Sequence, residues 1–148
     1  MTEHPPAGLL RRLAAAVYDA LLVTALCMLT TLCLIAFRGG EPISPGNLLY
    51  QLSLIATAAV FFIGFWVHGG QTLGMRAWRL RVEQRSGEAI NWKTGSIRFA
   101  AGILSVIPVG LGLLWLLVDP KRLAWHDRIS KTRVVLLPKP RKPKSSTK

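Results

Sequence analysis

Two long apolar stretches decide most of what this chain can fold into. Leu13 to Phe37 is 25 residues with Asp19 as its single charge, and Leu48 to Val67 is 20 residues with none. A helix rises about 1.5 Å per residue, so each stretch is long enough to cross a hydrocarbon core about 30 Å thick. Both are predicted to be transmembrane helices, which indicates an integral membrane protein and argues against a soluble enzyme.

The start of the first stretch is similar to an export signal, because Arg11 and Arg12 precede the apolar residues. Export signals have apolar cores of about 7–15 residues and end at a cleavage site of small residues. This stretch is longer, contains Asp19 and is followed by Arg38. We therefore interpret it as a retained helix.

The cations are distributed unevenly around these stretches. The loop from Arg38 to Asn47 carries one Arg and one Glu, whereas the segment from His68 to Arg98 carries six Lys or Arg against two Glu. The positive-inside rule then places the loop outside, and the second segment and the N-terminus in the cytoplasm. The formal net charge of +12 is thus interpreted as a signal for topology and anionic lipids, and no nucleic-acid partner is expected.

A third uncharged stretch, Phe99 to Val118, has Pro108 and Gly110 at its centre, which weaken helical hydrogen bonding there. A full crossing would place the C-terminal part, with ten Lys or Arg against two Asp, outside the membrane and against the charge rule. We favour a re-entrant hairpin with half-helices Phe99 to Ile107 and Val109 to Val118. A kinked full span is the alternative.

Two short strands are predicted in the cytoplasmic parts. Trp78 to Glu83 alternates apolar and charged residues, and Thr132 to Leu137 is rich in β-branched residues. They can pair if both lie on one side of the membrane. The expected architecture is an all-α integral membrane fold with a small β-pair, divided into a polar lead (1–8), a membrane domain (9–137) and a disordered basic tail (138–148).

Asp19 is the most informative polar residue, because a carboxylate within a membrane helix costs at least about 2.5 kcal/mol. It therefore needs a partner or a proton, and Arg12, Arg98 and Arg76 are the expected cationic candidates. Asp19 either holds helices together as a structural clasp or binds and releases a proton or cation. Both interpretations stay open.

His126 and Asp127 adjoin each other after the third stretch. Such a pair either relays protons near neutral pH or hydrogen-bonds a turn, and we favour the turn. The chain shows no zinc-like spacing of His, Cys or carboxylates, and no nucleophile beside a base. We expect neither catalytic activity nor a cofactor or metal. The tryptophans near the stretch ends, Trp66 among them, are interpreted as interfacial anchors.

Four motifs together resemble the RDD family of bacterial membrane proteins, in order and spacing, over roughly residues 9 to 137. They are Arg12 to Asp19, Gly70 to Gly74, Asp119 to Arg122 and Trp125 to Ser130. The family is named for one arginine and two aspartates. The resemblance implies that the arginine is Arg12, the first aspartate Asp19 and the second Asp127, with Asp119 as the competing assignment.

Two positions depart from the family pattern. Met75 stands where a lysine is usual, which argues against a phosphate or lipid role for that loop, and Lys131 stands where a glycine is usual, which predicts a changed turn. The resemblance implies a multi-pass protein of the bacterial cytoplasmic membrane without a settled activity. One hypothesis is a transport-related protein, coupled to protons or cations through Asp19. The alternative is a non-transporting interaction or scaffold module, and a second copy or another membrane protein is the expected partner in either case.

Overall fold

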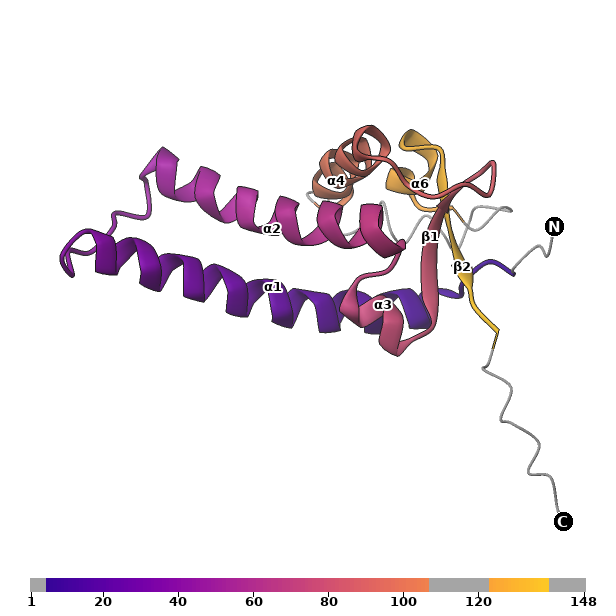
Figure 1. Ribbon diagram of the computed structural model, residues 1–148, viewed down its shortest axis with the longest axis horizontal. Coiled ribbons are helices and arrows are strands. Elements are labelled where there is room, and N and C mark those ends of the chain that lie inside the picture. Colours follow the sequence, from indigo (N-terminus) through magenta and orange to yellow (C-terminus); the bar gives the residue numbers. More distant parts are fainter. Residues whose placement is uncertain (1–4, 107–122, 139–148) are drawn as a thin grey trace, which may run out of the picture.

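Two long helices lie side by side and meet a small mixed head at one end (Figure 1). The computed structural model describes residues 5–106 and 123–138. The long helices are α1 (Leu9–Phe37) and α2 (Leu48–Gly69), and both are long and apolar enough to cross a membrane. The head contains α3 (Leu73–Ala77), β1 (Leu80–Gln84), α6 (Trp125–Ile129) and β2 (Thr132–Leu136). This mostly helical fold with a two-stranded sheet agrees with the predicted fold class.

Local signals fix both ends of α2. The side chain of Asn47 accepts a hydrogen bond from the Tyr50 backbone N–H at 3.1 Å, which satisfies one free donor of the first turn. Gly70 ends the helix in the left-handed conformation, with φ of 68°. A Cβ on Gly70 would lie 2.8 Å from the carbonyl oxygen of Val82, so the turn into the head requires a glycine on two counts.

A seam of hydroxyl groups joins α1 to α2. Thr30 contacts Thr57 at 3.1 Å, and Thr31 contacts the Tyr50 hydroxyl at 3.0 Å. Hydrogen bonds between membrane helices contribute on average about 0.6 kcal/mol each. The seam therefore fixes how the two helices face each other, although apolar residues cover most of their surface.

The two predicted strands do pair, antiparallel, with Val82 opposite Val134. The first strand begins at Leu80, so the prediction that it begins at Trp78 was wrong. Trp78 ends α3, and Arg79 has a left-handed backbone with φ of 56°, which breaks the extended chain before the strand starts. Leu80, Val82 and Val134 are buried in the core of the head.

The N-terminal lead adds backbone bonds to the free edge of β2. Ala7 N–H donates to the Val134 carbonyl at 3.1 Å, and Leu136 N–H donates to the Pro5 carbonyl at 3.0 Å. The residues before α1 thus extend the sheet in a way that the sequence did not predict. Both long-range partners of this lead come from the last described strand of the chain.

Helix α4 (Trp92–Val106) contains the start of the third apolar stretch and packs along α2. Trp92 lies beside His68, with ring centroids 6.0 Å apart, and Phe99 lies beside Phe62 at 6.2 Å. The start of α4 therefore lies beside the end of α2, and the middle of α4 lies beside an earlier part of α2, so the two helices run antiparallel. The predicted half-helix Val109 to Val118 lies outside the described residues.

Candidate functional site

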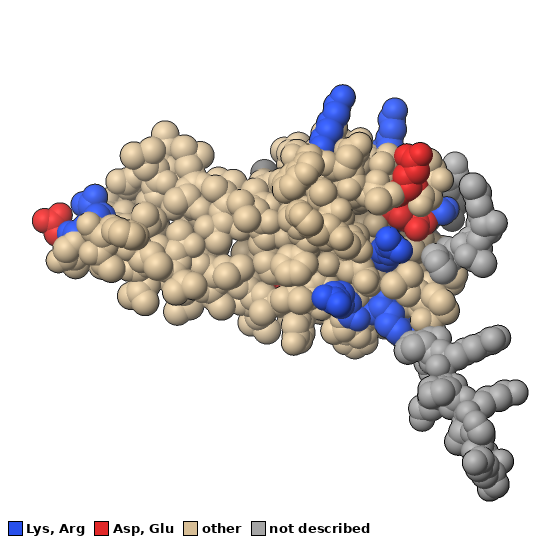
Figure 2. Space-filling model, viewed as in Figure 1, with Lys and Arg blue, Asp and Glu red and all other residues tan. Residues whose placement is uncertain are grey.

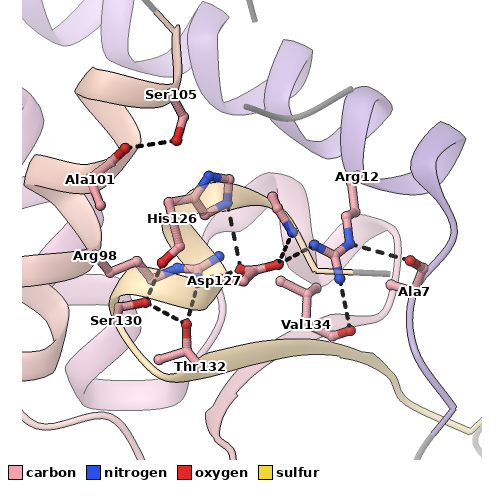
Figure 3. A network of polar contacts seen from close by, with 11 residues as sticks. Ala7, Arg12, Arg98, Ala101, Ser105, His126, Asp127, Ser130, Thr132 and Val134 are labelled. Atoms are coloured by element: carbon pink, nitrogen blue, oxygen red, sulfur yellow. Dashed lines mark hydrogen bonds and ion pairs between the residues drawn. The ribbon is translucent and has the colours of Figure 1, made fainter. Parts of the chain in front are cut away.

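A completely buried carboxylate, Asp127, lies at the centre of the polar head (Figure 3). Helix α6 places it, and the Ala124 backbone N–H donates to its Oδ2 at 3.2 Å. Arg12 of α1 donates through Nη1 to Oδ2 at 2.5 Å, and Arg98 of α4 donates through Nη1 to Oδ1 at 2.6 Å. One carboxylate therefore joins three helices that are distant in the sequence.

The two arginines extend this network into the sheet. Arg12 donates through Nε to the Ala7 carbonyl at 3.3 Å and through Nη2 to the Val134 carbonyl at 3.4 Å. Arg98 also donates to Thr132 Oγ1 at 2.5 Å. A guanidinium group that donates to several acceptors is held in one orientation. The start of α1 is thereby tied to both the N-terminal lead and β2.

Two small hydroxyl residues complete the C-terminal side of the network. Ser130 contacts Thr132, with their Oγ atoms 2.7 Å apart, and donates to the His126 carbonyl at 2.5 Å. Between them Lys131 has φ of 53°, a left-handed backbone that glycine adopts more easily. Lys131 therefore occupies a backbone conformation that favours glycine.

Within residues 5–106 and 123–138, the network around Asp127 contains two arginines and one carboxylate. Burial alone would raise the pKa of Asp127, but the charges of Arg98 and Arg12 outweigh it and hold the pKa well below its usual range. Burial and the positive charge of Arg98 lower the pKa of His126 to about 4, against the opposing effect of Asp127. At neutral pH the network therefore holds two cations, one anion and a neutral imidazole.

Three buried nitrogens near Arg98 make no hydrogen bond within residues 5–106 and 123–138. They are Arg98 Nε, Trp66 Nε1 and His126 Nδ1. The Arg98 guanidinium carbon lies 5.1 Å from the centroid of the Trp66 ring, which is a cation–π distance. A buried donor without an acceptor is costly, so this group of three requires an explanation.

Asp19 lies in a separate polar contact between α1 and the N-terminal turn of α3. Its Oδ2 accepts from the Thr72 hydroxyl and its Oδ1 accepts from the Gly74 backbone N–H at 2.8 Å. The expectation that Arg12, Arg98 or Arg76 pairs with Asp19 was wrong, because Arg12 and Arg98 bind Asp127 and Arg76 is exposed. No ion pair to Asp19 occurs among the described residues.

Gly74 makes the close approach to Asp19 possible. A Cβ on this residue would lie 2.4 Å from the Ala15 carbonyl oxygen and 2.9 Å from the Asp19 carboxylate. The next residue, Met75, is buried in the core of the head, and its backbone N–H donates to Thr72 Oγ1 at 3.2 Å. The apolar side chain at this position is thus part of the core of the head.

The structure brings together Arg12, Arg98, His126 and Asp127, four of the six residues singled out from the sequence. Asp19 is placed elsewhere, and Asp119 lies outside the described residues. Sequence reasoning did not single out Thr132 and Ser130 at Asp127, or Thr72 at Asp19. Thr72 lies inside the Gly70 to Gly74 motif and Ser130 ends the Trp125 to Ser130 motif, whereas Thr132 was noted only as the start of a predicted strand.

The geometry favours a structural role for Asp127 over acid–base chemistry. Its carboxylate is already bound by two guanidinium groups and a backbone N–H, and His126 Nε2 lies 3.6 Å from Oδ1, beyond a good hydrogen bond. A neutral imidazole beside a permanently ionised carboxylate has little tendency to pass protons near pH 7. Among the described residues, no group of His, Cys, Asp and Glu is arranged to hold a metal ion.

The sequence profile of the RDD family matches residues 6–131, which include both buried aspartates and both network arginines. No curated protein and no solved structure matches the chain.

Proposed function

This chain belongs to the RDD family, a family of membrane domains, and we propose that it acts as a non-transporting interaction or scaffold module, without enzymatic activity. The observation that carries this proposal is the ion network, in which Asp127 binds both Arg12 and Arg98. Such a network fixes the start of α1, the first part of α4 and the last strand in one arrangement. Charged networks of this kind specify a unique structure and present a defined surface.

The proposed topology places the head on the cytoplasmic side of a bacterial cytoplasmic membrane. Strand β1 follows α2 and the short helix α3, and strand β2 follows α6, so their pairing requires both to lie on one side. Helix α4 runs back along α2 from Trp92, and Val106 lies about 21 Å from that start at 1.5 Å per residue. These features support a re-entrant hairpin over a kinked span. The excess of cations in the head supports the cytoplasmic orientation.

The proposed partners of the head are anionic lipids. Figure 2 shows that, on the face in view, blue side chains gather around the head, and one further group of charged side chains lies at the distant loop. Exposed cations among the described residues of this half are Arg76, Arg81, Arg85, Lys93, Arg128 and Lys131. Each cation near an anionic leaflet contributes roughly 1 kcal/mol. The large apolar side chains exposed on α1, such as Leu21 and Leu32, face lipid, a second copy or another membrane protein.

A flux assay in proteoliposomes tests the scaffold proposal. Vesicles with the purified chain should show the same proton, sodium and potassium leak as vesicles without protein. The Asp19→Asn variant should give the same low leak. Flux that is present in the wild type and lost in Asp19→Asn, at equal incorporation, would refute the scaffold role in favour of transport.

One observation favours a second candidate, a protein coupled to protons or cations through Asp19. Asp19 is only 3% exposed inside α1, and the two partners of its carboxylate, Thr72 and the Gly74 N–H, are neutral. A buried membrane carboxylate without a cation is the kind of group that transporters protonate. Two spanning helices enclose little space for a hydrated path, so transport would require several copies or a partner.

A further inference from the structure

The head contains the same local structure twice. In each copy a five-residue helix is followed by a two-residue turn and a five-residue strand, first from α3 to β1 and then from α6 to β2. The second residue of each turn, Arg79 or Lys131, has a left-handed backbone. Every boundary of the second copy follows the matching boundary of the first by the same number of residues. The head is therefore built on an internal repeat.

The pairing of the strands relates the two copies by an approximate two-fold axis. Val82 and Val134 occupy the same position in the two copies, and they lie opposite each other in the antiparallel sheet. An axis between them, perpendicular to the sheet, exchanges β1 and β2. Both side chains share the core of the head with Ala15 of α1, so this face of the sheet is turned toward the long helices. In Figure 1 the strands cross the end of the long helices, with α3 near the start of β1 and α6 near the start of β2. The axis thus runs along the long helices and places α3 and α6 at one level, on opposite sides of the head.

Helix α3 lies at the level where α2 ends. Thr30 of α1 contacts Thr57 of the antiparallel α2. Along α1, Asp19 lies about 17 Å from Thr30 toward the head. Along α2, Gly69 lies about 18 Å from Thr57 in the same direction. Because Gly74 of α3 donates to Asp19 at 2.8 Å, α3 is beside the end of α2.

Helix α6 lies at the same level. Its Asp127 binds Arg98, and the Arg98 guanidinium carbon lies 5.1 Å from the centroid of the Trp66 ring, in the last turn of α2. The 22 residues of α2 span about 33 Å, close to the roughly 30 Å of a hydrocarbon core. The last turn of α2 therefore marks the boundary between acyl chains and headgroups, and both short helices lie at this boundary.

Both short helices expose the same kind of face at this boundary. The first, fourth and fifth residues of each helix are exposed and lie on one side of it, while the third residue is buried. The exposed residues are Leu73, Arg76 and Ala77 in α3, and Trp125, Arg128 and Ile129 in α6. Apolar side chains beside an arginine suit the lipid boundary, where carbon atoms meet acyl chains and the guanidinium reaches phosphate groups.

We propose that α3 and α6 are two equivalent membrane anchors, whose exposed faces insert into the headgroup region of the inner leaflet. Phospholipid is the partner that fits both faces, because a membrane surrounds the chain at this level, whereas one protein partner would cover a single side of the head. The inference rests on the proposed function, since it assumes a head at the cytoplasmic surface, and it adds apolar insertion to the attraction of exposed cations. Because α3 holds Asp19 through Gly74 and α6 carries Asp127, lipid contact also supports the two buried polar sites.

Spin labels on the full chain, reconstituted in mixed phosphatidylglycerol and phosphatidylcholine vesicles, test the two anchors. The labels are attached to Ala77→Cys and to Ile129→Cys, each in a Cys27→Ser and Cys33→Ser background. Both positions are exposed, so a label there leaves the core of the head unchanged. Collision of each label with oxygen, which concentrates in the bilayer, is compared with collision with a water-soluble nickel chelate.

Two exposed reference positions define the scale of this measurement. Met28→Cys lies in the middle part of α1 and reports the bilayer interior, and Ser86→Cys lies in the turn after β1 and reports water. The ratios of oxygen to nickel collisions at Ala77 and Ile129 should be similar and should lie between the two references. A ratio at either position equal to that of Ser86 would overturn the paired anchors. Slow collision with both reagents would also overturn them, because it would indicate a protein partner over that face.

High salt separates the anchors from charge attraction. The Debye length falls from about 8 Å at 0.15 M salt to about 3 Å at 1 M, so the attraction of the exposed cations is screened. Apolar insertion should leave the ratios at Ala77 and Ile129 unchanged. Ratios that fall to the Ser86 value in high salt would refute the anchors but leave the attraction to anionic lipids intact. The ion leak that would refute the scaffold role is measured separately, so the two proposals fail independently.

Discussion

Two buried aspartates of this chain are stabilised in opposite ways. Asp127 lies in the head and binds two guanidinium groups, whereas Asp19 lies in α1 and accepts from a hydroxyl and a backbone N–H. Ion pairs lower the cost of one buried charge but make each partner dependent on the other. Neutral donors create no such dependence. The contrast indicates that Asp127 and its two arginines depend on one another, while Asp19 makes a local contact between two helices.

The largest difference is expected when each aspartate is replaced by asparagine. Asp127→Asn removes the carboxylate that binds both buried guanidinium groups and should lower the free energy of unfolding by about 3–5 kcal/mol. Asp19→Asn retains one acceptor for Gly74 or Thr72 and should lower it by about 1–3 kcal/mol. Unfolding in mixed micelles measures both. Equal losses of unfolding free energy in the two variants would show that the two arginines at Asp127 make no difference to the cost of losing the carboxylate.

Acid should destabilise the head before it affects the membrane helices. The pKa of His126 is lowered to about 4 from an unfolded value near 6.5, so its contribution is complete above pH 6.5 and is lost as the pH falls to about 4. The pKa of Asp127 is also lowered, so its contribution is present above about pH 3.9 and is lost only at lower pH. Both groups therefore act in the same direction.

The expected loss between pH 6.5 and pH 4 is on the order of 2–3 kcal/mol, from the size of the His126 shift. Arg98, Arg12 and Asp127 are the charged groups that act on this imidazole. Unfolding measured across this range should show a slope that disappears in His126→Gln, where no imidazole titrates. A slope that persists unchanged in this variant would assign the acid sensitivity to other groups.

The stability of the Asp19 contact should depend on the size of the side chain at Gly74, whereas the stability of the Asp127 network should depend on charge. Gly74→Ala would place a methyl group 2.4 Å from the Ala15 carbonyl, so α3 must move away from α1. We expect a loss of about 1–3 kcal/mol, the usual cost of overpacking. Gly64→Ala is the matched control, because its Cβ would meet no atom within 4 Å. The two variants are compared by unfolding in detergent, and equal stability would contradict the tight contact.

The sequence predicted the individual elements and network residues better than the contacts between them. The long helices and the strand pair followed from apolar length and from alternation, which are local patterns. The residues of the network were singled out one by one, yet Arg12 was named among the candidate partners of Asp19, seven residues away, whereas it binds Asp127, which is 115 residues away. Nearness along one helix is visible in a sequence, whereas contact between helices depends on packing.

The short helices of the head were missed for a related reason. Helices α3 and α6 have five residues each, too few for a helical period to appear. Both depend on tertiary contacts, since α3 begins beside Asp19 and α6 carries Asp127. Trp66 was interpreted as an interfacial anchor, and its contact with Arg98 could not be predicted without the position of α4 along α2.

The smallest effect concerns the turns of the two regions. Gly70 and Lys131 both have left-handed backbones, with φ of 68° and 53°, but Lys131 carries a side chain there. A left-handed residue other than glycine costs roughly 1–2 kcal/mol, and glycine loses roughly 0.5–1 kcal/mol in chain entropy. Lys131→Gly should therefore stabilise the protein by about 0.5–1 kcal/mol, seen as a rise of a few degrees in Tm. Lys131→Ala removes the same charge but keeps a Cβ, so it should give no such rise. If both variants stabilise equally, the gain comes from the lost charge in a strongly basic chain, and the backbone of this turn stores no strain.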